Sequence, residues 1–280
     1  MPLYLRIHFL LIMFFQIKSY IKFLWLSKNE HGVHSPFVFD LVTKCFYDKK
    51  SKPDLSDAQQ AKQYQVLKNY RNSLLENKST LEVTDFGAGS KVFKSNTRSI
   101  SKIAKTAGIS QKRAELLFRV AHYFQPSTIL ELGTSLGLAT SALALGAKNA
   151  SITTIEGCQN TMAMAKKELH LFKFDKIECI TSEFNDHLNN CKLKTENCQL
   201  IFFDGNHSKS ATLQYFELLL PTITNETVWI FDDIHWSVGM EEAWEIIKKH
   251  PKVTVTIDTF QWGMVFFRRE QAKEHFVIRV

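Results

Sequence analysis

The stretch T-I-L-E-L-G-T-S-L-G, residues 128–137, decides the fold predicted for this chain. Its first five residues form a mostly apolar run typical of a buried strand, and Gly133 and Gly137 lie in the turn toward a helical segment. Glycine at such a turn lets the backbone approach a ligand closely, and the following helix presents free N–H groups there. The spacing is G-x-x-x-G, not the G-x-G-x-x-G of dinucleotide-binding loops. We interpret the stretch as a ligand-binding loop, with an ordinary strand-to-helix turn as the alternative.

Further apolar runs follow this stretch. Four of them alternate with helical segments, namely 151–156, 176–180, 200–204 and 228–233. Near-continuous apolar runs separated by helices predict parallel strands that are buried on both faces. The last two runs, 253–258 and 263–268, are only four residues apart, so they must pair as an antiparallel hairpin. The predicted fold class is α/β, a Rossmann-like seven-stranded sheet of five parallel strands and a C-terminal antiparallel hairpin.

The composition supports a large core with a basic front half. The chain has 280 residues, of which 45% are hydrophobic and 22% charged, and it holds only 11 Gly and 6 Pro. These values exclude a disordered, collagen-like or low-complexity protein. The net charge is +7, and residues 1–127 carry 20 Lys and Arg against 9 Asp and Glu. We therefore expect a basic, mostly helical N-terminal cap region (1–110) and a ligand-binding domain (111–280).

The cysteines and the amino terminus bear on where the protein acts. The five cysteines are odd in number and include no C-x-x-C pair, which argues against a disulfide framework and a cysteine zinc site. A reducing cytoplasm fits best. The uncharged run 7–17 is too short for a transmembrane span of about 20 residues, and no cleavage signal follows it. We expect a helix that docks on the protein, unless the chain begins at Met13.

Glu156 ends the second predicted strand, nineteen residues after Gly137. In doubly wound sheets an acid at this place accepts hydrogen bonds from the two hydroxyls of a ribose. A merely solvated acid is the alternative for Glu156 alone. The loop and the acid together indicate an adenosine-type ligand across the carboxyl ends of the strands.

Three aspartates follow the fourth and fifth predicted strands, namely Asp204, Asp232 and Asp233. Because the carboxyl ends of parallel strands meet at one edge, we expect all three to face one crevice. They could hold an amino group of the ligand or a divalent cation, although an Asp at this place also commonly caps the next helix. His207, in D-G-N-H, is a candidate general base because imidazole titrates near neutral pH, and His235 is its rival.

These motifs together resemble the class I S-adenosylmethionine-dependent methyltransferases over about residues 111–280. E-L-G-T-S-L-G resembles the first motif of that family, Glu156 matches its ribose-binding acid, and a terminal hairpin is the hallmark of its sheet. D-G-N-H-S and F-D-D-I-H-W are similar to small-molecule O-methyltransferases related to catechol methyltransferase. The resemblance implies methyl transfer from S-adenosyl-L-methionine to an oxygen, less readily a nitrogen, of a small-molecule acceptor. It implies these cofactor-binding residues: Glu131, Gly133, Thr134, Ser135, Gly137, Glu156, Glu183 and Asp204.

The same resemblance raises the question of a metal. That family binds magnesium through an aspartate after the fourth strand and an Asp-Asn pair after the fifth, which by position are Asp204, Asp232 and Asp233. Here Asp233 replaces the asparagine, Ser135 replaces the middle glycine of the first motif, and His207 stands where the family has a lysine base. Either Mg2+ is held by the three carboxylates, or His207 and Asp204 act without metal while Asp233 caps the next helix. We favour the metal-free route, whose acceptor would be an acidic phenol or a carboxylate.

Residues 99–120 support a competing class of function. Their I-A-x-x-A-G-I-S pattern before an apolar-periodic helix could pass for a helix-turn-helix in a DNA- or RNA-associated protein. We favour the simpler interpretation that two short helices meet at Gly108 and lead into the sheet. No Asn-Pro-Pro or Asp-Pro-Pro segment points to a nucleic-acid base methylase.

Residues 1–110 resemble the front part of uncharacterised bacterial methyltransferases that carry H-G-V-H-S-P-F (31–37). We expect this loop and the loop D-F-G-A-G-S (85–90) to lie closest to the crevice, since parallel-sheet enzymes build specificity from added segments. The basic region would then cap the active site. A homodimer is compatible with this organisation.

Overall fold

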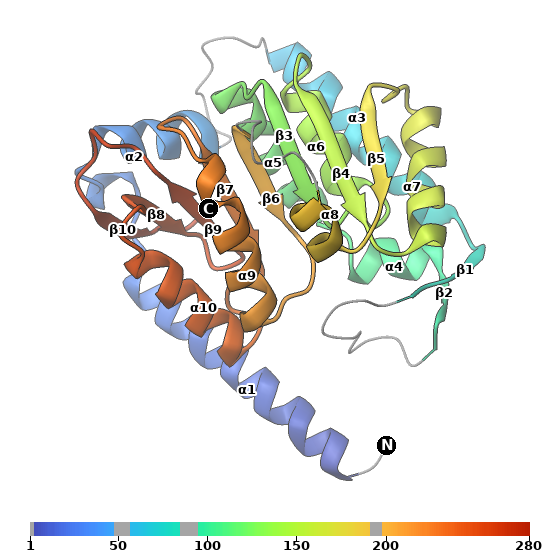
Figure 1. The fold of residues 1–280 in the computed structure, drawn as a ribbon, viewed down its shortest axis with the longest axis horizontal. Coiled ribbons are helices and arrows are strands. Elements are labelled where there is room, and N and C mark those ends of the chain that lie inside the picture. The colour runs from blue at the N-terminus through green and yellow to red at the C-terminus, as the bar shows by residue number, and fades with distance from the viewer. Residues whose placement is uncertain (1–2, 48–56, 85–94, 191–197) are drawn as a thin grey trace.

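The computed structural model describes residues 3–47, 57–84, 95–190 and 198–280, and its centre is one mixed sheet (Figure 1). In chain order the strands of this sheet are β3 (Thr128–Leu132), β4 (Ser151–Glu156), β5 (Ile177–Thr181), β6 (Leu200–Phe203), β7 (Val228–Asp232), β8 (Val255–Asp258), β9 (Trp262–Phe266) and β10 (Glu274–Val277). Their order across the sheet is β10-β8-β9-β7-β6-β3-β4-β5. Strands β3 to β7 are parallel, and β9 lies antiparallel between β7 and β8. The predicted α/β class, parallel strands and terminal hairpin are confirmed.

The edge strand β10 was not predicted from the sequence. It pairs parallel with β8, so within the described part of the chain the sheet has eight strands instead of the expected seven. Only one of its four side chains, that of Phe276, is buried, so no apolar run marks the strand. An edge strand pairs with a neighbour on one side only, so a single buried side chain is enough to hold β10 at the edge of the sheet.

Helices cover both faces of the sheet (Figure 1). One face carries α5 (Gln111–Phe124), α6 (Leu138–Gly146) and α7 (Gln159–Leu171), and the other carries α8 (Phe184–Asn190), α9 (Lys209–Leu219) with the short η4 (Leu220–Thr222), and α10 (Val238–Lys249). Successive side chains of a strand point to opposite faces, so Ile129 joins one apolar core and Leu130 the other. Burial on both faces explains why the strand sequences are almost continuously apolar.

The N-terminal region is mostly helical, as predicted. Its elements are α1 (Leu3–Leu26), η1 (Glu30–Gly32), α2 (Pro36–Leu41), η2 (Val42–Phe46), α3 (Asp57–Glu76), α4 (Ile100–Thr106) and a small antiparallel hairpin of β1 (Thr80–Glu82) and β2 (Thr97–Ser99). Val38 of α2 and Tyr70 of α3 belong to the same buried core as Ile129 of the sheet. The boundary at residue 110 stays a prediction, and the two regions share this core. None of the helices in the described ranges is long and apolar enough to cross a membrane.

The segment that could pass for a helix-turn-helix is part of the core. Helices α4 and α5 meet around Gly108, where an added Cβ would lie 2.3 Å from the Leu138 side chain. Helix α5 packs against α6 and buries these side chains: Ala114, Leu116, Leu117, Phe118, Val120 and Ala121. A helix buried in this way cannot lie in a DNA groove. Nothing in the fold therefore favours the nucleic-acid alternative.

The segment H-G-V-H-S-P-F lies at the opposite end of the sheet from the expected crevice. Ser35 caps α2, and its hydroxyl donates to Gln271. The ring of Phe37 packs edge-on against Phe266, which pairs with Val228 at the amino end of β7. The expectation that this segment lies closest to the crevice is wrong, because its aromatic group is used to cover the far end of the sheet. The second expected loop, residues 85–90, lies outside the described residues.

Candidate active site

The glycine loop between β3 and α6 has the tight backbone that its sequence predicts. Gly133 has φ +109°, and a Cβ there would lie 2.1 Å from the carbonyl oxygen of Asp204. Gly137 has φ +79°, caps α6, and leaves room for the hydroxyl of Tyr70, which would be 2.5 Å from an added Cβ. Ser135, in the middle position, also has a positive φ of 48°. A serine in this left-handed region costs about 1 kcal/mol or more, so neighbouring groups must hold it there.

Glu156 holds this loop. One carboxylate oxygen accepts from the backbone N–H of Ser135 at 2.9 Å, and the other accepts from the N–H of Cys158 at 3.0 Å. The acid is half-buried at the end of β4, so it is placed beside the loop as predicted. Its contact with a ribose stays a prediction.

Glu131 forms a buried polar network beneath the loop. Its Oε2 accepts from the hydroxyls of Thr140 at 2.5 Å and Thr154 at 2.6 Å, and Thr154 also shares a hydrogen bond with Thr134 at 2.6 Å. Burial raises the pKa of Glu131 to about 7, although the two threonine hydrogen bonds oppose the rise, and the charge of Glu156 adds to it. The buried Oε1 of Glu131 has no partner among the described residues. The predicted contact of Glu131 with the cofactor stays a prediction.

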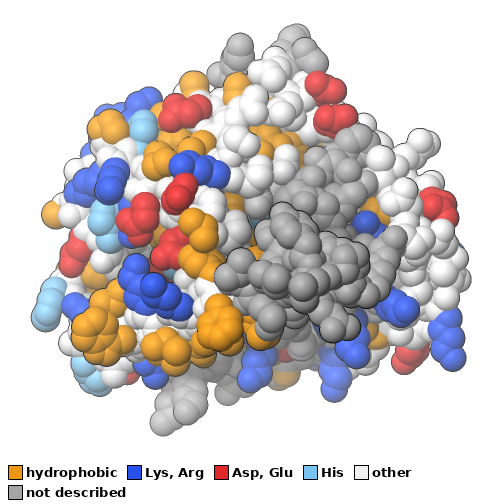
Figure 2. Space-filling model, turned by 90° about the horizontal axis from the view of Figure 1, so that it is seen from below, with side chains coloured by type: hydrophobic (Ala, Val, Ile, Leu, Met, Phe, Trp, Pro, Cys, Tyr) orange, Lys and Arg blue, Asp and Glu red, His pale blue; other side chains and the backbone are white. Residues whose placement is uncertain are grey.

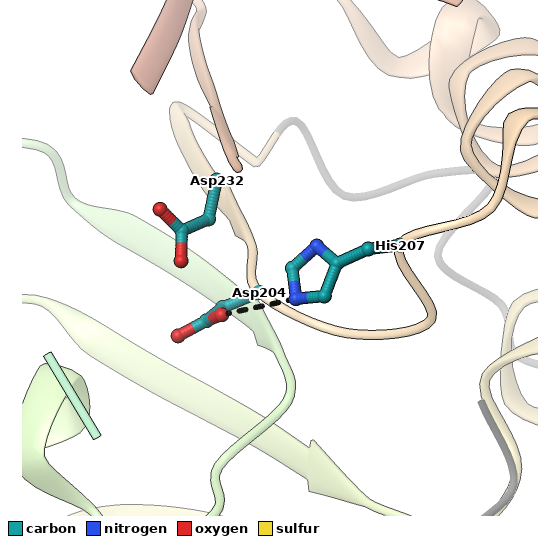
Figure 3. Close-up of side chains that lie close together, drawn as sticks. All are labelled: Asp204, His207 and Asp232. Atoms are coloured by element: carbon teal, nitrogen blue, oxygen red, sulfur yellow. Dashed lines mark ion pairs between the residues drawn. The ribbon is translucent and has the colours of Figure 1, made fainter. Parts of the chain in front are cut away.

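Asp204, His207 and Asp232 converge at the carboxyl ends of β6 and β7 (Figure 3). One polar atom of each lies within 4.8 Å of the others, and His207 Nε2 is 3.6 Å from Asp204 Oδ1. Burial, together with the nearby charge of Asp232, raises the pKa of Asp204 well above its usual range. Two carboxylates and one imidazole therefore share a small acidic site at this edge. The sequence predicted all three aspartates at one crevice with His207 beside Asp204, and the structure brings two of these aspartates together with His207.

Arg113 is a member of this site that sequence analysis missed. It extends from the first turn of α5 and forms an ion pair with Asp232, and its guanidinium lies over the ring of Trp262, 5.3 Å from the ring centre. Only three residues join α5 to β3, so the helix runs antiparallel to the strand and begins near the carboxyl ends of the sheet. The basic first turn of a helix that precedes the glycine loop was the available signal. In the sequence, these positive charges are also compatible with the helix-turn-helix alternative for residues 99–120.

The third predicted magnesium ligand lies outside the cluster. Among the described residues, Asp233 is not one of the three groups that converge, and its backbone has a positive φ of 54°. It does not cap the next helix either, because Ser237 caps α10 with a hydrogen bond from the N–H of Met240. Asp232 is already paired with a cation. The observed arrangement therefore does not fit a magnesium ion held by three carboxylates, and we derive no step through a metal.

Among the described residues, the other two predicted side chains are not part of the converging cluster. His235, the rival base, lies largely but not fully buried between Asp258 and Glu241, 2.8 Å and 3.7 Å away. Burial lowers its pKa, but these two acids outweigh it and raise the pKa to about 9. A histidine that holds its proton at neutral pH cannot accept another, which removes it as a base. Glu183 is exposed at the start of α8, and its contact with an adenine stays a prediction.

Comparison with known proteins agrees with this architecture. Residues 130–234 match the family model described as a methyltransferase domain. No curated protein sequence matches the chain significantly. Three solved structures share its fold at low identity. A methyltransferase of Podospora anserina bound to S-adenosylhomocysteine has 14% identity, a TM-score of 0.52, and coverage of 84% of this chain and 97% of its own.

The other two structures are described as O-methyltransferases. One, from Bacillus cereus and in complex with S-adenosylhomocysteine, has 19% identity, a TM-score of 0.50, and coverage of 78% of this chain and 94% of its own. The other, TomG from Streptomyces achromogenes, is involved in tomaymycin synthesis and is in complex with S-adenosylmethionine. It has 18% identity, a TM-score of 0.50, and coverage of 58% of this chain and 82% of its own.

Proposed function

We propose that this chain is a class I methyltransferase and that it transfers the methyl group of S-adenosylmethionine to an oxygen of a small-molecule acceptor, which its match to a methyltransferase domain over residues 130–234 and its sheet support. One observation carries the proposal: the glycine loop held by Glu156 and the Asp204–His207–Asp232 cluster lie at the same edge of the sheet. Ligands of open α/β sheets bind at this edge. The O-methyltransferases among the similar structures support oxygen over nitrogen as the acceptor atom.

The residues of the loop fit S-adenosylmethionine. This cofactor supplies a methyl group activated by a positively charged sulfur. The loop from Gly133 to Gly137 would pass under its methionine part, Glu156 would hold its ribose, and Glu183 would lie beside its adenine. Glu156 suits this role because its carboxylate can accept from two hydroxyls at once, and its two bonds to the backbone already fix its position.

The acidic cluster fits the chemistry of the acceptor. His207 would take the proton of the acceptor hydroxyl, and Asp204, 3.6 Å from its ring, would hold the imidazole in place. The carboxylates of Asp204 and Asp232 also favour a cationic ligand at this edge. Transfer of a methyl group needs the acceptor oxygen in line and about 3 Å away, so positioning contributes most of the rate.

The test is cofactor binding by isothermal titration calorimetry. The wild type should bind S-adenosylmethionine and S-adenosylhomocysteine, and Glu156→Gln should weaken both by roughly tenfold or more, because it removes a charge-assisted bond. Glu178→Gln, which changes an exposed acid on the neighbouring strand β5, is the matched control and should change neither affinity. A wild-type protein that binds neither compound would refute the proposal. Unchanged affinity in Glu156→Gln would refute the arrangement of the ligand.

The acceptor can then be sought with a library of small molecules. Crystals soaked with S-adenosylhomocysteine and candidate acceptors would show which compound occupies the space beside His207. Once an acceptor is known, turnover should persist in EDTA. Activity that vanishes with the chelator and returns with magnesium would show that a metal is needed.

A further inference from the structure

The acidic site already contains a positive charge of its own. We propose that Arg113 takes the place of a divalent cation between the strand-end aspartates, so that this site works without metal. The inference rests on the methyltransferase function proposed above. Among the described residues, Arg113 is the cation that pairs with Asp232, and its charge also acts on Asp204, whose pKa it lowers against the larger effect of burial.

Two contacts, in addition to the ion pair with Asp232, hold Arg113 in this position. Its backbone N–H donates to the side chain of Ser110, which caps α5. Its guanidinium lies over the buried ring of Trp262, a favourable cation–π contact. Trp262 is also the residue of β9 that pairs with Asp232 of β7, so the register of the sheet fixes the ring beside the acid. These contacts therefore fix the Arg113 guanidinium beside Asp232, where a metal ion would otherwise be bound.

This arrangement disfavours a metal at the same place. A magnesium ion needs carboxylate oxygens that are free to coordinate it, and Asp232 is engaged in a charge-assisted pair. A divalent cation among Asp204, His207 and Asp232 would also lie next to a guanidinium of like charge. A guanidinium carries one delocalised charge and lowers the pKa of a hydroxyl less than a metal does. The site therefore suits an acceptor oxygen that is already acidic, such as a phenol or a carboxylate.

The inference can be tested by metal binding without any acceptor. Mn2+ is the probe, and its free concentration is followed by electron paramagnetic resonance. The wild type should bind Mn2+ weakly, and Arg113→Met should bind it roughly tenfold or more tightly, since the acids lose their internal cation. Arg113→Lys keeps the charge and should show no gain. Lys112→Met removes an exposed charge of the same helix and is the matched control.

Two outcomes would overturn the inference. The wild type could bind Mn2+ as tightly as Arg113→Met, or Arg113→Met could bind no more Mn2+ than the wild type does. Arg113→Gln replaces Arg113→Met if the latter does not fold, as judged by circular dichroism. Binding of S-adenosylhomocysteine is measured on every variant. A wild type that does not bind S-adenosylhomocysteine would refute the proposed function. The Mn2+ affinities of the wild type and of the Arg113 variants alone decide the role of Arg113.

A second inference concerns the outer face of α1 and stands on different observations. Four apolar side chains, spaced three to four residues apart, are exposed on one side of this helix: Phe14 (68%), Ile17 (50%), Ile21 (61%) and Trp25 (86%). Figure 2, in which the molecule is seen from below, shows orange hydrophobic side chains with blue lysine and arginine side chains among them. We call these four residues the outer stripe.

The opposite side of α1 is attached to the protein. Gln16 donates to the carbonyl of Trp236, Ser19 donates to Glu241, and Phe23 is buried against Phe260. The rotation of the helix is therefore fixed. The outer stripe is exposed because the polar and apolar groups of the inner side already have their partners.

The positive charges beside the outer stripe indicate what kind of surface binds to it. Lys18, Lys22 and Lys28 are exposed next to it, and the first 29 residues contain no Asp or Glu. Glu241 lies 3.6 Å from Lys22, but no acid of the first 29 residues offsets Lys18 or Lys28, so a two-fold contact between two copies of α1 would set these lysines against each other. A membrane with anionic headgroups complements both features, because lysines reach the headgroups while aromatic and aliphatic groups enter the interface. We infer that α1 lies on the surface of an anionic lipid bilayer.

The test is sedimentation with vesicles of phosphatidylcholine alone or with phosphatidylglycerol added. The full chain should sediment with the anionic vesicles at least about tenfold more than with the neutral ones, and high salt should reduce the difference. A variant with all four residues of the outer stripe changed to Ser should stay in the supernatant. The matched control changes three exposed apolar residues elsewhere to Ser, namely Leu171, Val238 and Ile246, and should sediment like the wild type.

Trp25 provides a second measurement that does not depend on the fourfold variant. Its fluorescence should shift to shorter wavelength when anionic vesicles are added, and the shift should be absent in Trp25→Phe. Absence of both sedimentation and shift in the wild type would overturn the inference. A dimer in the wild type that the fourfold variant loses, as measured by analytical ultracentrifugation, would assign the outer stripe to a second copy of this chain instead.

Discussion

Raising the pH should destabilise this protein through one buried histidine. His235 follows β7 and lies between two acids, with Asp258 of β8 at 2.8 Å and Glu241 of α10 at 3.7 Å. Lys22 of α1 reaches the same Glu241 at 3.6 Å, and the ring of Phe260 stacks on the imidazole. The side chain of His235 is only 10% exposed, so solvent screens these charges weakly.

The direction of the effect follows from the pKa. The two acids raise the pKa of His235 from 6.5 to about 9 despite its burial. Because the pKa is higher in the folded than in the unfolded chain, the stabilisation is fully present below about pH 6.5 and is lost as the pH rises through about 9. A shift of this size corresponds to about 3 kcal/mol, at about 1.4 kcal/mol per unit. The pKa of Glu241, lowered to about 2 chiefly by His235, describes the same pair from its other side and is not added.

Urea unfolding at several pH values measures this contribution. Between about pH 7.5 and about pH 9.5 the wild type should lose about 2 kcal/mol of unfolding free energy through His235. His235→Gln removes the titrating group, so its free energy of unfolding should be lower at pH 7.5 and should change less over the same range. The difference between the two proteins cancels the titration of lysines, tyrosines and cysteines. An equal loss in both proteins would refute the reasoning.

Three further predictions concern the loop and the cluster. Gly133→Ala should lower the free energy of unfolding by several kcal/mol in urea, because the φ of +109° and the nearby carbonyl oxygen of Asp204 exclude a Cβ. Gly239→Ala is the control and should change little, because an added Cβ there would lie 3.4 Å from its nearest neighbour. Tyr70→Phe should cost about 1 kcal/mol, because the 2.8 Å hydrogen bond to the carbonyl of Leu136 is lost, and calorimetry should show weaker S-adenosylhomocysteine binding if this bond also shapes the loop. Once an acceptor is known, His207→Gln should lower kcat by roughly 100-fold or more while cofactor affinity stays unchanged, and an unchanged kcat would exclude it as the base.

The parts of the fold that the sequence predicted are those that local patterns determine. Parallel strands buried on both faces leave continuous apolar runs, and the short connection before β9 forces a hairpin, so both were predictable. The positive φ values at Gly133 and Gly137 follow from the residue type at a tight turn. The sequence of strand β10 contains no such apolar run, since the strand pairs at one edge of the sheet and buries one side chain. The position of residues 31–37 could not be predicted from the sequence either, because Phe37 could have packed on any apolar surface of the sheet.

The candidate site shows why residue type alone could not assign roles. His207 and His235 each follow an aspartate at a strand end, and in the sequence only the family resemblance, which puts His207 at the place of the lysine base, separates them. The acids that protonate His235 come from β8 and from α10, and Asp258 is 23 residues away along the chain. Arg113 is 119 residues from Asp232, and it reaches that acid only because α5 runs antiparallel to β3. The protonation of one histidine and the counter-charge of the acidic pair are thus set by contacts between elements. A search for such partners in related chains should therefore begin with the first turn of the helix before the glycine loop, where a basic residue faces the strand ends.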